Sequence, residues 1–245
     1  MHAISHISGQ DTYQMMNQVI AFDADDTLWV NEPLFREAEK EFSGLMRDFL
    51  EREECAKKLY ECVTNNLPLY GYGIKSFALS LTEVAIQISD GKVPNEILVR
   101  VINIGKEMLN APVVVLDGVK EILDTLTASK RPHDKLIVAT KGDLLDQERK
   151  FEKSGLAGYF DHIEVMSDKQ PANYRKLITK LGVQPKDFTM IGNSVKSDIL
   201  PVLEIGGRAF HIPYHTTWQH EVVKEPVVHP NFKELKSILT LEKYL

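Results

Sequence analysis

From residue 117 onward, segments typical of β-strands alternate with segments typical of helices. In chain order these segments are expected at 117–130, 135–140, 144–155, 162–167, 171–182, 188–193, 196–207 and 208–213. Such alternation forms a parallel sheet, because right-handed crossover connections place the helices on both faces. The sequence therefore predicts an α/β fold with a doubly wound parallel sheet, in which residues 208–213 form the last strand.

A long helical block interrupts this organisation after a first strand at residues 18–25. Between residues 34 and 110, apolar side chains recur at the three- and four-residue spacing of helices, and glycines divide the block into three or four helices. We therefore expect a core domain made of residues 1–29 and 112–245. Residues 30–111 are expected to form a helical subdomain inserted into it.

Charged and hydroxyl side chains follow the predicted strands where each one ends. Asp23, Asp25 and Asp26 crowd the end of the first strand, where mutual repulsion and burial make unpaired carboxylates costly. The ends of the later strands supply the remaining candidates, which are Thr140, Lys169, Asn193 and Asp198. Ligands of open α/β sheets bind beyond the carboxyl ends of the strands. We therefore expect these residues to meet at one site.

The residue types at this site indicate phosphate chemistry. Asp23, Asp25 and Asp198 offer hard oxygen ligands of the kind that Mg²⁺ prefers. Lys169 and Thr140 would hold a phosphate from the other side, as ammonium and hydroxyl donors. Mg²⁺ and the lysine would cancel the repulsion between one carboxylate and the phosphate, so that this carboxylate could attack phosphorus. A second would protonate the leaving group and later deprotonate a water molecule.

Four segments, in order, resemble the motifs of the haloacid dehalogenase superfamily of aspartate-nucleophile hydrolases. They are FDADDT, LIVAT, the lysine of SDKQP, and IGNSVKSD, and they fall within residues 18–213. The helical insertion follows the first segment, where the family carries a helical C1-type cap. The resemblance implies a Rossmann-like core under that cap. It also implies a Mg²⁺-dependent phosphatase that acts on small phosphorylated metabolites.

The resemblance assigns roles to the residues of the first segment. Asp23 would be the nucleophile that forms an aspartyl-phosphate and a metal ligand. Asp25 would be the general acid and base, with its backbone carbonyl also reaching the metal. Thr27 is grouped with the substrate-binding residues and is expected to position Asp25 by a hydrogen bond. Asp26 is interpreted as a bystander.

The later segments would bind the phosphoryl group and the metal. By resemblance, Thr140 and Lys169 bind the transferred phosphoryl group, and Asp198 is a metal ligand. Asn193 departs from the pattern, since the family often has an acid directly after the glycine at this point. An asparagine would ligate the metal through its neutral oxygen or through a water molecule, so weaker metal binding is expected.

Asp25 also distinguishes between reactions within the family. Members that cleave carbon–halogen bonds lack an acid at this position, because halide leaves without a proton, whereas an alkoxide needs one. A 2-haloacid dehalogenase is therefore the weaker alternative. A phosphomutase acting on a phosphorylated sugar shares every candidate residue and stays open. So do two non-enzymes, a phospho-accepting signalling domain and a catalytically inactive binding protein.

Composition and targeting signals limit the classes of partner and the cellular compartment that we expect for this protein. A net charge of −6 gives no broad basic surface, so nucleic acid is not expected as a partner. No apolar stretch is long enough for a membrane span, and no signal peptide is evident at residues 1–18. Cys55 and Cys62 are expected to be free thiols. We therefore expect a cytoplasmic protein with a small-molecule partner, and nothing in the sequence fixes its oligomeric state.

Three histidines in and after the last predicted strand suggest a zinc site at first sight. His211, His215 and His220 are four and five residues apart, which matches no usual zinc-ligand spacing. We expect this segment to be a loop that borders the site. Trp29, directly after the first motif, is expected near the mouth of the site.

Overall fold

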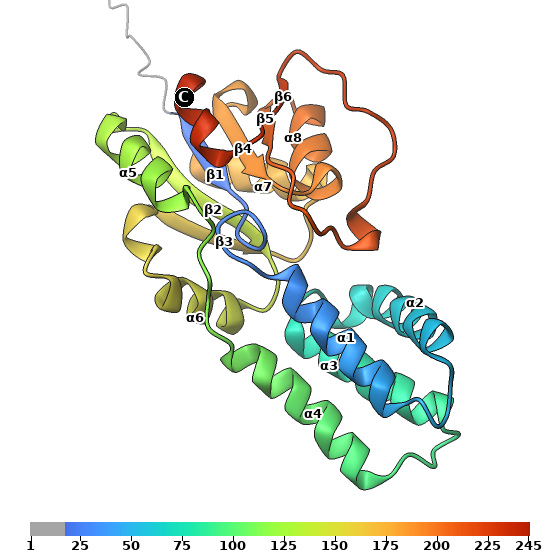
Figure 1. The fold of residues 1–245 in the computed structure, drawn as a ribbon. Helices are drawn as coiled ribbons and strands as arrows, with labels where there is room; N and C mark the ends of the chain where they lie inside the picture. Colours follow the sequence, from blue (N-terminus) through green and yellow to red (C-terminus); the bar gives the residue numbers. More distant parts are fainter. Residues whose placement is uncertain (1–17) are drawn as a thin grey trace, which may run out of the picture.

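The computed structural model describes residues 18–245, which form a parallel sheet covered by helices on both faces, with a separate helical layer beyond it (Figure 1). Within these residues the sheet has six strands in the order β3-β2-β1-β4-β5-β6, and all neighbours are parallel. The predicted doubly wound α/β fold is confirmed. The strands are β1 (Val19–Phe22), β2 (Lys135–Lys141), β3 (His162–Met166), β4 (Phe188–Gly192), β5 (Arg208–His211) and β6 (Phe232–Glu234). Both the signal-peptide prediction and the first 17 residues of the predicted core domain fall outside the described residues.

β1 lies where the strand order reverses. From β1 the chain builds β2 and β3 on one side of the sheet and then crosses to β4 and β5 on the other. Phe22, the last residue of β1, pairs with Val138 of β2 and with Ile191 of β4. Loops that leave neighbouring strand ends in opposite directions open a crevice between them. This topology therefore puts the crevice beyond Phe22, where Asp23 begins.

Helices cover both faces of the sheet because strand side chains alternate in direction. Phe22 belongs to a core cluster with Val119 and Phe151, whereas its neighbour Ala21 packs with Tyr174 and Val202 on the opposite face. The helices on these two faces are α5 (Val119–Ser129), α6 (Leu144–Ser154), α7 (Pro171–Leu181) and α8 (Leu200–Glu204). Short 3₁₀ helices are found at Ala157–Tyr159, Pro185–Asp187, Gln219–Glu221 and Ile238–Lys243.

Two local features differ from the sequence prediction. Residues 208–213 are not the last strand, since β6 pairs with β5 at the edge of the sheet. β6 has three residues with little burial, too few to show a periodic pattern. The helix expected at 196–207 begins as a π-helical turn, Val195–Ile199. Pro201 has no backbone N–H to donate, and the carbonyl of Ser197 accepts a 3.0 Å hydrogen bond from the Tyr174 hydroxyl instead.

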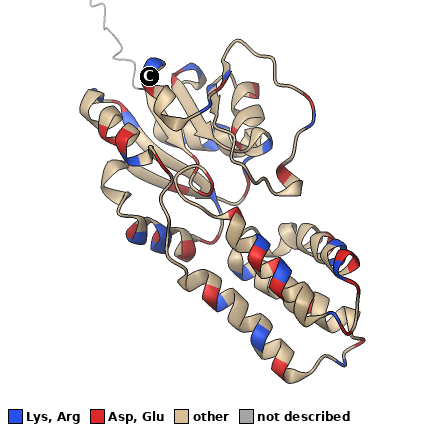
Figure 2. Ribbon diagram, in the orientation of Figure 1, with Lys and Arg blue, Asp and Glu red and all other residues tan. Residues whose placement is uncertain are grey.

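The helical layer consists of α1 (Glu32–Leu45), α2 (Arg52–Tyr70), α3 (Ile74–Ile88) and α4 (Asn95–Asn110). These helices share a hydrophobic cluster of their own, which includes Phe42, Leu59, Leu81 and Val101. Figure 2 shows acidic and basic residues interspersed along α1, α2 and α4. Because this layer has its own core, it can pack as a unit over the ends of the strands.

Two chain segments that run side by side join the helical layer to the sheet. The backbone N–H of Val30 donates to the carbonyl of Val114 at 2.9 Å, and that of Leu116 donates to Leu28 at 3.0 Å. Trp29 forms an antiparallel bridge with Val115 between these bonds. The outgoing segment carries the residues that follow β1, so the same pairing also anchors the first predicted motif.

Two further expectations concern the chain as a whole. No helix among residues 18–245 is long and apolar enough to cross a membrane. Cys55 and Cys62 are free, with Cys55 buried in the helical layer and Cys62 half-buried beside Glu83. The prediction of two unpaired thiols is therefore confirmed.

Candidate active site

A buried ion-pair triad occupies the carboxyl ends of three strands. Lys169 follows β3, is 2% exposed, and donates its Nζ to Asp23 after β1 and to Asp198 beyond β4, the latter at 2.6 Å. Burial and the nearby Asp198 charge raise the pKa of Asp23 to about 7, although Lys169 opposes the shift. The two carboxylates raise the pKa of Lys169 despite its burial. The structure thus brings together three residues that the sequence predicted would meet.

Oxygen atoms converge on the side chain of Asn193. One terminal atom of its amide lies 3.3 Å from Asp23 Oδ2, 3.3 Å from the Asp25 carbonyl oxygen and 3.2 Å from Thr27 Oγ1. In the protein alone, the amide nitrogen fits this position, since it donates to all three oxygens. Turned over, the amide would present its oxygen instead. Asp23, the Asp25 carbonyl and Asn193 would then offer three oxygens to a hard divalent cation.

These donors fit Mg²⁺ better than a metal held by side chains alone. No group of three His, Cys, Asp or Glu side chains in residues 18–245 is placed to hold a metal. Here one donor is a backbone carbonyl and another is an amide, as suits an ion that keeps several water ligands. Asp198 lies next to this set, with Oδ2 accepting a 3.0 Å hydrogen bond from the backbone N–H of Ser194.

The carboxylate of Asp25 points away from this oxygen cluster and toward α6. Its Oδ1 accepts hydrogen bonds from Trp29 Nε1 at 2.7 Å and from Lys150 Nζ at 2.9 Å. Its Oδ2 accepts one from Gln147 Nε2 at 2.9 Å. Burial would raise the pKa of Asp25, but Lys150 and these hydrogen bonds lower it overall. Asp25 is therefore held as a carboxylate by three side chains.

The predicted partner of Thr27 was wrong. Its hydroxyl faces Asp23 Oδ2 at 3.4 Å and the Asn193 amide at 3.2 Å, and it makes no hydrogen bond to Asp25. The cause is a tight turn, in which the backbone N–H of Leu28 donates to the Ala24 carbonyl and folds Thr27 back over β1. Trp29 binds Asp25 in its place.

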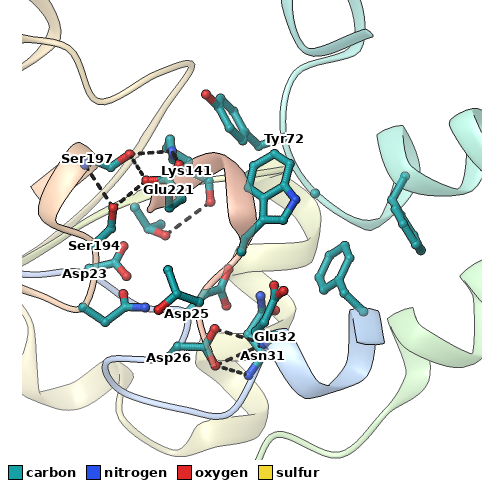
Figure 3. Close-up of a pocket in the computed structure, with 18 of the residues that line it drawn as sticks. Asp23, Asp25, Asp26, Asn31, Glu32, Tyr72, Lys141, Ser194, Ser197 and Glu221 are labelled. Carbon is teal, nitrogen blue, oxygen red and sulfur yellow. Dashed lines mark hydrogen bonds and ion pairs between the residues drawn. The ribbon is translucent and has the colours of Figure 1, made fainter. Parts of the chain in front are cut away.

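Asp26 is more than a bystander, because it holds the start of the helical layer. Its carboxylate accepts hydrogen bonds from the backbone N–H groups of Asn31 at 2.8 Å and Glu32 at 3.0 Å (Figure 3). These groups begin α1, where backbone donors lack partners within the helix. Burial raises the pKa of Asp26 to about 7. Asp26 thus connects the strand end to the first helix above it.

Glu221, from the loop after β5, gathers a second polar cluster that the sequence did not predict. It accepts hydrogen bonds from Lys141 Nζ at 2.8 Å and from Ser194 and Ser197 at 2.5 Å each (Figure 3). Burial would raise its pKa, but Lys141 and the hydroxyl donors lower it to about 2. Thr140, 1% exposed, precedes Lys141 and lines the same cavity.

The three histidines lie apart and serve different neighbours. His211 contacts Glu234 and the carbonyl of Asn193, each at 3.0 Å, His215 contacts Thr216, and His220 contacts Lys196. They form no joint site. His211 is the last residue of β5, and the loop that follows it, with His215 and His220, borders the cavity as the sequence predicted.

A cavity of about 180 Å³ lies between the strand ends and the helical layer. Its floor holds the triad of Asp23, Lys169 and Asp198, together with Thr140 and Asn193. Its walls come from α1, α2, α3, the residues between α2 and α3, and the loop after β5. Aromatic residues of these walls are Phe35, Tyr60, Tyr72, Phe77 and Trp218. The site can therefore enclose a small molecule with one charged end on the floor.

Comparison with known proteins gives a consistent result. A family model for haloacid dehalogenase-like hydrolases matches residues 18–206. A haloacid dehalogenase-like family hydrolase from Xanthomonas campestris is 34% identical, with a TM-score of 0.79 over 90% of this chain and 86% of that one. The N-acylneuraminate-9-phosphatase of Mus musculus is 26% identical over 86% of this chain and 85% of its own length. A 2-haloacid dehalogenase from Pseudomonas syringae, 19% identical with a TM-score of 0.61 over 93% of this chain and 97% of that chain, shares the fold.

Proposed function

The chain belongs to the haloacid dehalogenase-like hydrolases, and we propose that it is a phosphomonoesterase that transfers the phosphoryl group of small phosphate esters to Asp23 and then to water. The observation that carries the proposal is the pairing of buried Asp23, bound to Lys169, with a second carboxylate at Asp25. An ester leaves as an alkoxide that needs a proton, and Asp25 is the nearby acid that can supply it. The similarity to N-acylneuraminate-9-phosphatases supports the same reaction.

In the first step, an Asp23 carboxylate oxygen attacks phosphorus and the bond from phosphorus to the ester oxygen breaks. Asp25, which carries the proton taken from the attacking water of the preceding turnover, gives this proton to that oxygen. Lys169 and Thr140 bind the phosphoryl oxygens, and Lys169 offsets their repulsion from Asp23. The result is an alcohol and an aspartyl-phosphate on Asp23.

In the second step, water attacks phosphorus and the bond to Asp23 breaks, which releases inorganic phosphate. Asp25 accepts the proton of the attacking water. Lys150, Gln147 and Trp29 support this role, because they hold Asp25 in the carboxylate form that a base requires. Burial of Asp23 and Lys169 keeps other water away from the reacting bond.

The donor set fits Mg²⁺, which we propose as the cofactor. Asp23, the backbone carbonyl of Asp25 and Asn193 would hold it, with Asp198 beside them. Bound there, Mg²⁺ would neutralise phosphate charge during attack. We propose in addition that the helical layer acts as a cap that closes over small phosphorylated metabolites.

Phosphate release from an aryl phosphate, with and without Mg²⁺, tests this function. Wild-type protein should turn over only with the metal, and Asp23→Asn should lower kcat at least about 1,000-fold, since the amide does not attack phosphorus. Asp48→Asn, an exposed change in the helical layer, is the matched control and should leave kcat unchanged. Full activity of Asp23→Asn would reject the mechanism.

A further inference from the structure

Above its charged floor, the cavity has an aromatic wall. Phe35 of α1 and Phe77 of α3 meet edge to face, with ring centroids 5.1 Å apart. Tyr72, between α2 and α3, meets Trp218 of the loop after β5 in the same way at 6.4 Å. These pairs come from different elements and enclose one space. A flat apolar group can pack there with little loss of hydrogen bonding to water.

The positive charges that line this cavity already have partners. Among residues 18–245 they are Lys169 and Lys141. Lys169 is held between Asp23 and Asp198. Lys141 donates to Glu221 at 2.8 Å and to Ser197 at 2.9 Å, and its Nζ lies 4.1 Å from the centre of the Tyr72 ring. Neither ammonium faces the aromatic wall as a free partner for a second anion.

Carboxylates on α1 extend the negative charge from the floor up this wall. Glu32 and Glu39 both line the cavity. They share Arg36, at 3.0 Å and 3.3 Å, and this guanidinium lies outside the lining and is 43% exposed at its side chain. Two carboxylates against one guanidinium leave a net negative charge when both are ionised. A second anion on the substrate would therefore be repelled here.

From these contacts we propose that the enzyme selects phosphate monoesters whose alcohol portion is apolar, preferably aromatic, and carries no negative charge. This inference rests on the proposed phosphomonoesterase function and adds a substrate class to it. The phosphate group of the substrate binds Lys169 on the floor, and the alcohol portion packs between Phe35, Phe77 and Trp218. A carboxylate on that portion would meet Glu39 without a cation to offset it.

Matched esters test the charge preference with the full-length protein and Mg²⁺. The probes are phenyl phosphate, 4-carboxyphenyl phosphate and 4-(aminomethyl)phenyl phosphate, assayed at about pH 8 to ionise Glu32, whose pKa burial raises to about 7. We expect kcat/KM for the carboxylate ester to be at least about tenfold below that for phenyl phosphate, mainly through KM. The aminomethyl ester should equal or exceed phenyl phosphate.

One variant and one pair of alkyl esters complete the test. Glu39→Gln should lower the ratio of kcat/KM for phenyl phosphate to kcat/KM for 4-carboxyphenyl phosphate to about threefold or less. Glu37→Gln, on the exposed side of the same helix, should leave this ratio unchanged. Benzyl phosphate should exceed glycerol 3-phosphate in kcat/KM by about tenfold.

Each contrary result has a distinct meaning. Turnover of the carboxylate ester equal to or above that of phenyl phosphate overturns the substrate class and leaves the phosphomonoesterase function standing. An unchanged ratio of kcat/KM for these two esters in Glu39→Gln overturns the proposal that carboxylates of α1 repel a second anion. A preference for glycerol 3-phosphate overturns the apolar wall. Hydrolysis of none of these esters rejects the proposed function and this inference with it.

Discussion

The floor and the walls of the cavity are built in opposite ways. On the floor, Asp23, Lys169 and Asp198 follow strands β1, β3 and β4 and form one buried ion-pair cluster. On the walls, aromatic residues and carboxylates come from helices α1 to α3 and a loop, with no common backbone frame. The sheet topology therefore determines the chemistry, while side chains on separate elements determine what is admitted. Changes to the floor should affect all substrates equally, and changes to the walls should discriminate among them.

The largest effect is expected on the floor, from Lys169→Met. This change leaves Asp23 and Asp198 buried without a cationic partner and removes a proposed phosphoryl contact. We expect kcat to fall at least about 100-fold for every ester, and stability to fall by about 3–5 kcal/mol. Steady-state kinetics and urea unfolding measure the two effects. A loss confined to some alcohols would break the distinction between floor and walls.

A smaller effect is expected for Lys150→Met, which removes the ammonium that holds Asp25. We expect kcat to fall about 10- to 100-fold for alkyl and aryl phosphates alike, because Asp25 without Lys150 is a poorer base in the second step, which is the same for every ester. Lys153→Met, one turn along α6 and 3.4 Å from its carbonyl partners, is the control. Restored kcat in Lys150→Arg would indicate that the positive charge at this position holds the Asp25 carboxylate in place. An unchanged kcat in Lys150→Met would contradict the role of this ammonium.

On the walls, Trp218→Ala should raise KM for benzyl phosphate about tenfold while kcat changes little, since we propose that this ring contacts the alcohol portion and not the phosphoryl group. The same change should hardly affect methyl phosphate. Tyr214→Ala, in the same loop but outside the cavity lining, serves as the control. An equal rise in KM for both esters would indicate that Trp218 supports the structure of the loop and does not contact the alcohol portion.

The smallest effect on turnover is expected from Glu221, which ties the loop after β5 to the strand ends. Its folded pKa of about 2 lies below the ordinary 4.5, so its contribution to stability is present above about pH 4.5 and is lost as pH falls toward 2. We expect the stability difference between wild type and Glu221→Gln to be on the order of 2–3 kcal/mol at pH 6 and to vanish near pH 2. Urea unfolding across pH measures it, with exposed Glu225→Gln as the control. A difference that persists at pH 2 would exclude this electrostatic origin.

The floor could be predicted from the sequence because strand ends in a parallel sheet meet at one edge. Asp23, Lys169 and Asp198 each follow a strand that apolar pattern alone locates, so their meeting follows from topology. Thr27 lies beside Asp23 and Asn193, so the hydrogen bond to Asp25 that the sequence predicted was wrong. The turn from Ala24 to Leu28 decides its direction, and that turn depends on backbone hydrogen bonds that no spacing rule describes.

The walls could not be predicted in the same way. Glu221 reaches Lys141 across 80 positions through a loop without periodicity, so no local pattern links them. Gln147 and Lys150 lie on an amphipathic helix where polar residues ordinarily face water, and only the position of α6 against Asp25 turns them inward. Which of the helical layer's aromatic residues face the cavity depends on how that layer sits over the sheet.

We propose that Asp23 carries the phosphoryl group between the two steps. Asp25→Asn should lack the base of the second step, so an aryl phosphate with Mg²⁺ should leave phosphoenzyme that survives an acid quench. Mass spectrometry of the digested Asp25→Asn protein should find one added phosphoryl group on the peptide that contains Asp23. The double variant with Asp23→Asn and Asp25→Asn should show no added phosphoryl group. A phosphoryl group on another residue, or steady turnover in Asp25→Asn with no labelled peptide, would reject Asp23 as the nucleophile.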